Sequence, residues 1–323
     1  MEISDNSDVY SYISSLSIVI PVYNSVASLE ELIKRIEPVI MRFEKYEVIL
    51  VNDGSVDTSW EMIKRIAGRY EWVIGINLAR NYGQHNSLLC GIREAHNKFI
   101  VTMDDDLQQP PEEIPTLLQK LTEGYQVVYG TPQKVQQTFW RSLASRFLRF
   151  VLSTFLGRKI ARDVSPFRAF STTLRDEFSR FNNPAVSIDV LLTWSTTQFT
   201  SVLIPYSPRR SGKSTYSFIK LFAHSMDMLT GYSTMPLHLA TVLGFILTFF
   251  GFCALVYVIG SYLIVKGSAP GFPFLASLIS IFSGATLFTL GVIGEYLARI
   301  YLNILGRPPY IIQAVIETRK DSS

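Results

Sequence analysis

The stretch that decides the fold is residues 98–113, KFIVTMDDDLQQPPEE. Its first six residues are mostly apolar and rich in β-branched and aromatic side chains, which predicts a buried strand over Lys98–Met103. Three consecutive carboxylates, Asp104 to Asp106, follow this strand directly. A proline and two acidic residues at 111–113 then favour the first turn of a helix, where the helix dipole stabilises negative charge. The stretch therefore predicts a strand, a polar loop and a helix.

The same alternation of strands and helices extends toward the N-terminus and just beyond the stretch. Apolar runs predict strands at Leu16–Val22, Tyr46–Val51, Trp72–Leu78 and Val127–Tyr129. Helical spacing predicts helices at Ser28–Met41, from Asp57 onward and at Gln84–His96. This order predicts an α/β fold with a mostly parallel sheet, in which ligands bind at the carboxyl ends of the strands.

Polar clusters follow three of the predicted strands: residues 21–24 (PVYN), 52–55 (NDGS) and 104–108 (DDDLQ). In a parallel sheet the three clusters meet at one edge. The carboxylate of Asp53 suits a ribose or base contact, because it accepts hydrogen bonds from hydroxyl or N–H groups. If residues 104–108 stay extended, Asp104, Asp106 and Gln108 share one face and Asp105 points away. A solvated turn is the alternative, but a position directly after a buried strand favours a site.

The three adjacent carboxylates predict a bound cation, since like charges in a partly buried site repel one another. Oxygen ligands of this kind suit Mg²⁺ or Mn²⁺, which also bind substrate phosphates. The four histidines show no metal-ligand spacing. The sequence therefore predicts an acidic metal and nucleotide site.

Composition divides the chain of 323 residues into a soluble part and an apolar part. Thirty basic and 27 acidic residues give a net charge of +3, which excludes a nucleic-acid binder that depends on bulk positive charge. Between Pro236 and Gly294 the only Asp, Glu, Lys or Arg is Lys266. Each run beside Lys266 is long enough to cross a bilayer. We predict transmembrane helices at 236–265 and 272–298; a pair of buried core helices is the alternative.

The flanking charges predict how this hairpin is oriented. Four basic residues precede the first span (Arg209, Arg210, Lys213 and Lys220), and Arg299 and Arg307 follow the second. The positive-inside rule then places both termini and the soluble domain in the cytoplasm. The N-terminus has neither the basic nor the apolar region of a signal peptide. Cys90 and Cys253 offer no disulfide framework, which fits a reducing compartment.

The remaining divisions follow from polarity. We predict a polar tail at 1–15, a catalytic domain at 16–215 and a cytoplasmic tail at 299–323. From Arg141 to Arg180 the chain has nine basic and three acidic residues. Residues 139–156 and 216–232 are amphipathic, which predicts helices that lie in the membrane interface. Helices packed on the domain's own core are the alternative.

Four motifs in this order resemble the family 2 glycosyltransferases of GT-A (Rossmann-like) fold: PVYN, VNDGS, LARNYGQHNSLLCGI and MDDDLQQPPEEIP. The resemblance covers nearly the whole chain and is closest to the polyprenyl-phosphate sugar transferases. It implies inverting transfer of a sugar from a nucleotide-diphosphate donor to a polyprenyl (undecaprenyl) monophosphate at the cytoplasmic face of a bacterial plasma membrane. A UDP-sugar is favoured over GDP and dTDP donors, with Mg²⁺ or Mn²⁺ as cofactor. A homo-oligomer, by resemblance a tetramer, is expected.

The resemblance also implies roles for individual residues. The nucleotide sugar is expected at Pro21, Tyr23, Asn24, Asp53, Ser55, Arg80, Asp104 and Asp105, and the metal at Asp104, Asp106 and Gln108. The acceptor phosphate or donor diphosphate is expected at Arg168, Arg209, Arg210, Lys213 and Ser214. Asp106, Asp163 and Arg168 are expected to be the catalytic residues.

Three positions depart from the family pattern: Ser25 replaces a glutamate, Pro166 an acid and Thr215 a lysine. Pro166 weakens the prediction that Asp163 is a general base. A lipid monophosphate, with a second pKa of about 6, is already nucleophilic near neutral pH, so Asp163 would be an orienting group.

Two other functions compete with this interpretation. A processive polysaccharide synthase would carry a Q-x-x-R-W motif, which this sequence lacks. A catalytically inactive nucleotide-sugar-binding scaffold fits the three departures, but the intact DDDLQ argues against it. The sequence leaves the sugar open among glucose, mannose, N-acetylated sugars and amino sugars.

Overall fold

The computed structural model describes residues 10, 12–133, 163–178, 181, 186–207, 234–265 and 272–317. The chain forms two compact units, Met1–Phe222 with Gly306–Ser323, and Ala223–Leu305. Both predicted amphipathic stretches, residues 139–156 and 216–232, lie outside the described residues. The two units are taken separately below.

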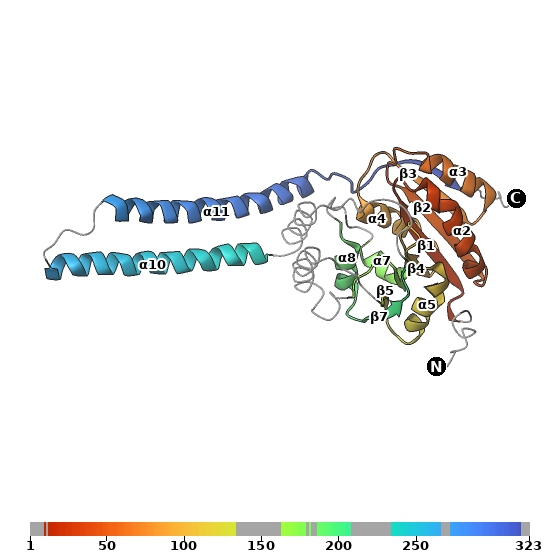
Figure 1. Ribbon diagram of the computed structural model, residues 1–323, viewed down its shortest axis with the longest axis horizontal. Helices are drawn as coiled ribbons and strands as arrows, with labels where there is room; N and C mark the ends of the chain where they lie inside the picture. Colours follow the sequence, from red (N-terminus) through yellow and green to blue (C-terminus); the bar gives the residue numbers. More distant parts are fainter. Residues whose placement is uncertain are drawn as a thin grey trace. The chain divides into compact units, whose positions relative to one another are not determined.

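The first unit is built on an eight-stranded sheet with the order β7-β5-β6-β4-β1-β2-β3-β8 (Figure 1). The strands are β1 (Ser15–Val22), β2 (Lys45–Asn52), β3 (Val73–Leu78), β4 (Phe99–Thr102), β5 (Val127–Pro132), β6 (Arg168–Ser171), β7 (Phe199–Ile204) and β8 (Ile312–Glu317). β1 pairs in parallel with β2 and β4, and β2 with β3. β6 and β8 run antiparallel to their neighbours. The prediction of a mostly parallel sheet is confirmed.

Helices cover both faces of the sheet, because the strands are apolar on both sides. Helices α2 (Val26–Ile40), α3 (Ser59–Arg69) and α5 (Ile114–Thr122) pack in one apolar cluster, with Ile18 and Leu50 of the strands. Helices α4 (Gln84–Glu94) and α8 (Ile188–Ser195) pack in the other, with Val19. α7 (Thr172–Phe178) joins this second cluster, and the short helix η1 (Pro111–Glu113) precedes α5. Consecutive strand residues thus enter opposite layers, as the period of two requires.

Both ends of this unit differ from the sequence prediction. Ile13 is fully buried and β1 begins at Ser15, so the folded domain includes residues that were predicted to belong to the polar tail. The predicted tail at 299–323 contains β8, which pairs with β3. A sheet edge exposes unpaired backbone groups, and β8 satisfies those of β3. Its alternation of half-buried and exposed residues is a strand pattern that the sequence analysis missed.

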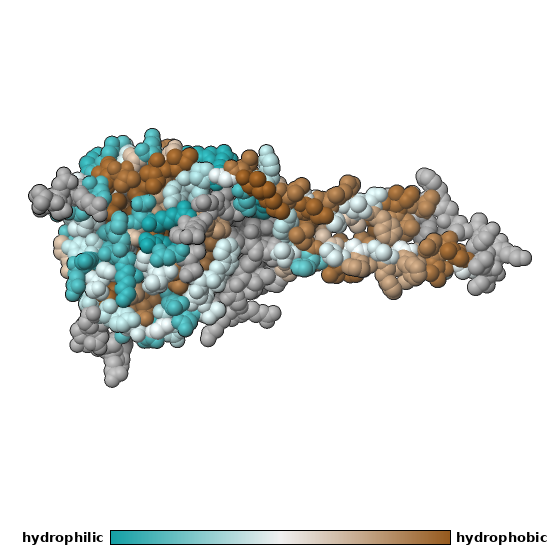
Figure 2. All heavy atoms as spheres, turned by 180° about the vertical axis from the view of Figure 1, so that it is seen from behind, coloured by the Kyte–Doolittle hydropathy of each residue, from teal (hydrophilic) through white to brown (hydrophobic). Residues whose placement is uncertain are grey.

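The second unit contains two long helices, α10 (Met235–Val265) and α11 (Phe272–Ile304). The segments Met235–Gly260 and Ile281–Ile304 are long and apolar enough to cross a membrane, with mean hydropathies of 2.5 and 1.4. Figure 2 shows apolar residues over much of both helices. Large side chains such as Phe245 (74% exposed) and Leu287 (69% exposed) face outward, so these are not core helices of a soluble protein. The structure supports a membrane protein, and α11 extends past the predicted end at residue 298.

Candidate active site

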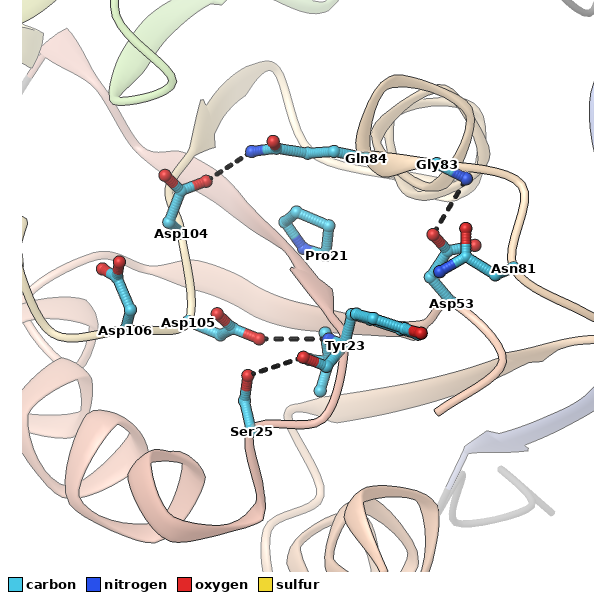
Figure 3. Close-up of a pocket in the computed structure, with 11 residues that line it drawn as sticks. Pro21, Tyr23, Ser25, Asp53, Asn81, Gly83, Gln84, Asp104, Asp105 and Asp106 are labelled. Atoms are coloured by element: carbon cyan, nitrogen blue, oxygen red, sulfur yellow. Dashed lines mark hydrogen bonds between the residues drawn. The ribbon is translucent and has the colours of Figure 1, made fainter. Parts of the chain in front are cut away.

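A pocket of about 430 Å³ lies where the first strands of the sheet end (Figure 3). Six of its lining residues belong to the predicted site: Pro21, Tyr23, Asp53, Asp104, Asp105 and Asp106. Five others had no predicted role at the site: Val22, Ser25, Asn81, Gly83 and Gln84. Pro21 and Val22 end β1, Asp53 directly follows β2, and Gln84 begins α4. The loops after β1, β3 and β4 supply the other lining residues. The structure therefore brings the three predicted polar clusters to one edge, as the parallel sheet required.

Each carboxylate of the acidic cluster, residues 104–106, has its own hydrogen-bond partners. Asp104 accepts from Gln84 Nε2 (2.6 Å) and Gln109 Nε2 (3.2 Å). Asp105 accepts from the backbone N–H of Tyr23 (3.2 Å). Figure 3 shows the side chain of Asp105 directed toward Tyr23 and that of Asp104 toward Gln84. The cluster thus bridges the loops after β1 and β3.

Asp106 and Gln108 are hydrogen-bonded to each other, but not because the chain is extended, as was predicted. The chain does not stay extended, because Leu107 adopts a left-handed backbone conformation (φ 62°). Gln108 then donates to Asp106 through its backbone N–H (3.1 Å) and its Nε2 (2.6 Å). In this arrangement Gln108 supports the carboxylate of Asp106 through its amide nitrogen.

Burial and mutual repulsion shift the proton affinity of this cluster. Burial is the largest cause that raises the pKa of Asp104 to about 7, and the charges of Asp106 and Asp105 add to it. Burial also raises the pKa of Asp105 to about 6, although hydrogen bonds from Ser25 and Tyr23 oppose the shift. Both carboxylates therefore favour a neutralising partner, a proton or a cation, near neutral pH.

The donor set fits a divalent cation that is shared with a ligand. Among the described residues, no group of three His, Cys, Asp or Glu side chains is arranged to enclose a metal ion. Asp104 and Asp106 nevertheless present hard oxygen atoms at an open pocket. Mg²⁺ is commonly held by one or two carboxylates and completed by substrate phosphates and water. A cation here would need ligand oxygens to complete its coordination shell.

The pH dependence of Mn²⁺ binding should follow the raised pKa of Asp104. Below pH 7 this carboxylate holds a proton that the cation must displace, whereas above pH 7 the proton is already lost. We expect the Mn²⁺ dissociation constant to rise about tenfold between pH 8 and pH 6, and to change little between pH 8 and pH 9. Calorimetric titration at the three pH values measures it. A dissociation constant that is the same at pH 6 and pH 8 would contradict this assignment.

Asp53 holds one wall of the pocket in place. Its carboxylate is 3% exposed and accepts from the backbone N–H groups of Tyr82 (2.7 Å) and Gly83 (2.9 Å). Burial raises the pKa of Asp53, and these two amides oppose the shift. Asp53 therefore anchors the loop after β3, in addition to lining the pocket.

Three residues predicted at the nucleotide support the pocket from outside its lining. Asn24, in a left-handed conformation (φ 54°), donates its backbone N–H to Ser55 Oγ (3.0 Å). Its Oδ1 accepts from Val56 N–H (2.9 Å), so the loops after β1 and β2 are joined. The guanidinium of Arg80 lies 4.8 Å from the ring centre of Tyr82. These contacts are structural, and a direct nucleotide contact by Asn24, Ser55 or Arg80 stays a prediction.

Gly54 must be a glycine, because the anchored loop passes directly over it. Its φ is +62°, and a Cβ there would lie 2.4 Å from the carbonyl carbon of Arg80 and 2.5 Å from the Asn81 nitrogen. We expect Gly54→Ala to lower the free energy of unfolding by about 2–3 kcal/mol, from backbone strain and overpacking. Gly68→Ala, in α3 with nothing within 4 Å of the new Cβ, should not destabilise the protein. Melting curves of the two variants in detergent test this contrast, and equal destabilisation would contradict it.

Arg168 is not among the residues that line the pocket, and its role at a phosphate stays a prediction. It is 2% exposed, and its guanidinium forms an ion pair with the buried Asp189 of α8. Its Nε also donates to Thr102 Oγ1 (3.1 Å), two residues before Asp104. Asp189, which the sequence analysis missed, also accepts from the hydroxyl of Tyr129 (3.0 Å). Arg168 thus lies inside the fold, beside the strand that leads into the acidic cluster.

Asp163, the predicted base, is not among the described residues that line the pocket. Asp163 accepts from Ser201 Oγ (2.8 Å) on β7. Arg209, Arg210, Lys213 and Ser214 lie outside the described residues, and their contact with a phosphate stays a prediction.

Comparison with known proteins identifies the family of the chain. The model of the glycosyl transferase family 2 matches residues 17–179. An undecaprenyl-phosphate 4-deoxy-4-formamido-L-arabinose transferase of Proteus mirabilis is 36% identical over 313 residues, which cover 95% of this chain and 96% of the relative. A transferase of the same name from Enterobacter sp. (strain 638) is 34% identical, with 94% of both chains covered.

A solved structure agrees at the level of the fold. Glucosyl-3-phosphoglycerate synthase from Mycobacterium tuberculosis, in complex with Mn²⁺, UDP-glucose and phosphoglyceric acid, has a TM-score of 0.52 at 18% identity. The match covers 71% of this chain and 82% of that one. The fold is therefore of the GT-A type, with a pocket at the carboxyl edge of the sheet. The chain belongs to glycosyltransferase family 2 and is a glycosyltransferase.

Proposed function

We propose that this enzyme transfers a sugar from a nucleotide-diphosphate donor, a UDP-sugar, to the phosphate of undecaprenyl phosphate, with inversion. The observation that carries the proposal is a pocket lined by Asp53 and Asp104 to Asp106 in a chain that matches an undecaprenyl-phosphate sugar transferase over nearly its whole length. The two apolar helices supply the membrane contact that a lipid acceptor requires.

Different residues of the pocket bind different parts of the nucleotide-sugar donor. Pro21 and Tyr23, from the end of β1, border the base; Tyr23 is 49% exposed and offers an open aromatic face for stacking. Asp53 and the loop that it anchors enclose the ribose side. Asp104 and Asp106 face the diphosphate, and a bound Mn²⁺ or Mg²⁺ would neutralise the charge that develops on the leaving group there.

The nucleophile of the reaction is the phosphate group of the lipid acceptor. An oxygen of the lipid monophosphate attacks the anomeric carbon, a new C–O bond forms, and the bond from that carbon to the nucleotide diphosphate breaks. A phosphate monoester with a second pKa of about 6 is already largely deprotonated at neutral pH, so no proton has to be removed. Positive charge must instead bring two anions together, a task we assign to Arg209, Arg210 and Lys213.

The basic flanks of the hairpin favour a cytoplasmic active site. By the positive-inside rule, the basic residues within 209–220 and 299–307 belong on the cytoplasmic side. We therefore propose that the catalytic unit and both termini lie in the cytoplasm. Reaction of single cysteines placed in these flanks with a membrane-impermeant thiol reagent in intact cells would contradict this orientation.

Purified full-length protein tests the function directly. It is incubated with Mn²⁺, undecaprenyl phosphate and a panel of labelled nucleotide sugars, and the lipid products are identified by mass. A sugar joined to the lipid through one phosphate supports the proposal. A polymer would instead support a processive synthase, and no transfer from any donor would support an inactive binding protein.

A further inference from the structure

The segment that follows the second apolar helix contacts β3 and the residue after it, next to the loop that lines the pocket. Helix α11 ends at Ile304 and strand β8 begins at Ile312. β8 pairs with β3, and the loop that follows β3 supplies Asn81 and Gly83 to the pocket. In Figure 1 this C-terminal segment, in blue, runs beside β3. Residues more than two hundred positions apart in the sequence therefore meet beside the loop that lines the pocket.

The first contact holds the base of the pocket loop. The backbone N–H of Ala79, the residue after β3, donates to the carbonyl oxygen of Ile311 (2.9 Å). The register of the two strands shifts at this point, between Asn77 and Leu78. Ile311 therefore fixes where the loop leaves the sheet, just before it turns over Gly54 toward Asp53.

A row of side-chain amides forms the second contact. Asn77 Nδ2 donates to Gln313 Oε1 (3.0 Å), and Asn52 Nδ2 donates to Asn77 Oδ1 (2.7 Å). The row runs from β8 across β3 to the end of β2. Asn52 is 2% exposed and directly precedes Asp53, the anchor of the pocket loop. The amide of Gln313 is thus linked through two asparagines to the residue beside that anchor.

The third contact reaches helix α4. Arg93 Nη1 donates to the hydroxyl of Tyr310 (3.4 Å), and its guanidinium carbon lies 5.7 Å from the centre of the Tyr310 ring. α4 begins at Gln84, whose side chain lines the pocket and donates to Asp104. Tyr310 therefore supports the helix that presents Gln84 to the acidic cluster.

We propose that residues 310–313 are a positioning element of the donor pocket, which holds the 79–83 loop and helix α4 against Asp53 and Asp104. The three contacts act on β3, on the end of β2 and on α4, and those elements carry the pocket residues Asp53, Asn81, Gly83 and Gln84. None of residues 310–313 lines the pocket itself. Residues 310–313 would therefore affect the reaction only through binding of the donor. That the ligand of the pocket is a nucleotide sugar rests on the proposed function.

The test combines two variants with two readouts. Tyr310→Ala with Gln313→Ala removes both side-chain contacts, and Val315→Ala changes an exposed side chain on the same face of β8 as Gln313. Hydrogen exchange of the ligand-free protein is followed at the amides of Tyr82 and Gly83, which donate to Asp53. UDP binding is measured by titration in the presence of Mn²⁺. The KM for undecaprenyl phosphate is measured as well.

We expect about tenfold faster exchange at Tyr82 and Gly83 and about tenfold weaker UDP binding in the double variant, with the KM for the lipid unchanged. Val315→Ala should stay within twofold of the wild type in all three measurements. If the double variant does not fold, Gln313→Ala alone, at an exposed side chain, is expected to give about threefold faster exchange at the same amides.

Unchanged exchange at Tyr82 and Gly83 in a folded variant would overturn the proposal, as would an equal effect of Val315→Ala. The exchange measurement uses no ligand. If the wild type failed to bind UDP, the donor assignment would fall, and the exchange rates would still decide the positioning role.

Discussion

Asp106→Asn is expected to lower kcat/KM for sugar transfer by about a thousandfold, the scale seen when one group that stabilises transition-state charge is removed. Asp106 lines the pocket, and its carboxylate already accepts from Gln108. Asparagine keeps the volume and one acceptor oxygen, but it loses the negative charge that would hold a divalent cation against the donor diphosphate. Initial rates with Mn²⁺ and the nucleotide sugar found in the donor panel measure the loss.

Glu113→Gln is the matched control for this substitution. Glu113 lies in η1 of the same segment, and its carboxylate accepts from Thr116 Oγ1 (2.9 Å) away from the pocket lining. Its variant should retain activity within twofold of the wild type. If Asp106→Asn kept full activity while Mn²⁺ was still required, the assignment of Asp106 to the metal would be wrong.

Asp189→Asn is expected to lower the free energy of unfolding by about 3–5 kcal/mol, because the charge of Arg168 is left buried without a counter-charge. The side chains of Arg168 and Asp189 are 2% and 9% exposed, so water cannot replace the lost partner. Denaturant unfolding in detergent measures the change. Asp176→Asn, in the exposed pair with Arg175, should change stability by less than about 1 kcal/mol. Similar losses in both variants would contradict the burial argument.

An uncharged replacement of the Arg168–Asp189 pair distinguishes a structural role of Arg168 from a catalytic one. Arg168→Gln combined with Asp189→Asn removes both charges and keeps hydrogen-bonding groups, so it should recover much of the stability lost in Asp189→Asn. If Arg168 turns toward a phosphate during catalysis, as the family resemblance implies, the recovered protein will be inactive. If its role is the structural one seen here, transfer activity will be largely retained.

The parallel part of the fold could be predicted from the sequence because local patterns specify it. β-branched runs ended by turn residues gave β1 to β5 within a few positions, and the place of Asp53 and Asp104 at strand ends followed from the sheet type. β6 and β7 were missed. So was β8, since a six-residue strand gains its stability from a partner far away in the chain, β3.

The partners of the site residues could not be predicted in this way. Nothing local to Asp53 indicates that both its oxygens accept from residues 82 and 83, and nothing near Arg168 identifies Asp189 on α8 as its counter-charge. Such pairs depend on which side chains the packed helices bring together. The position of Gln108 could not be predicted either. Its prediction assumed an extended chain over residues 104–108, and the left-handed backbone of Leu107 ends that extension.

An experimental structure of the full chain with Mn²⁺ and UDP would locate the donor site and its metal ion. We expect UDP in the carboxyl-edge pocket, with its base beside Pro21 and Tyr23 and its diphosphate sharing the manganese ion with Asp106. The anomalous signal of manganese fixes the position of the ion independently of the nucleotide. Manganese away from Asp104 and Asp106, or UDP bound outside this pocket, would contradict the account.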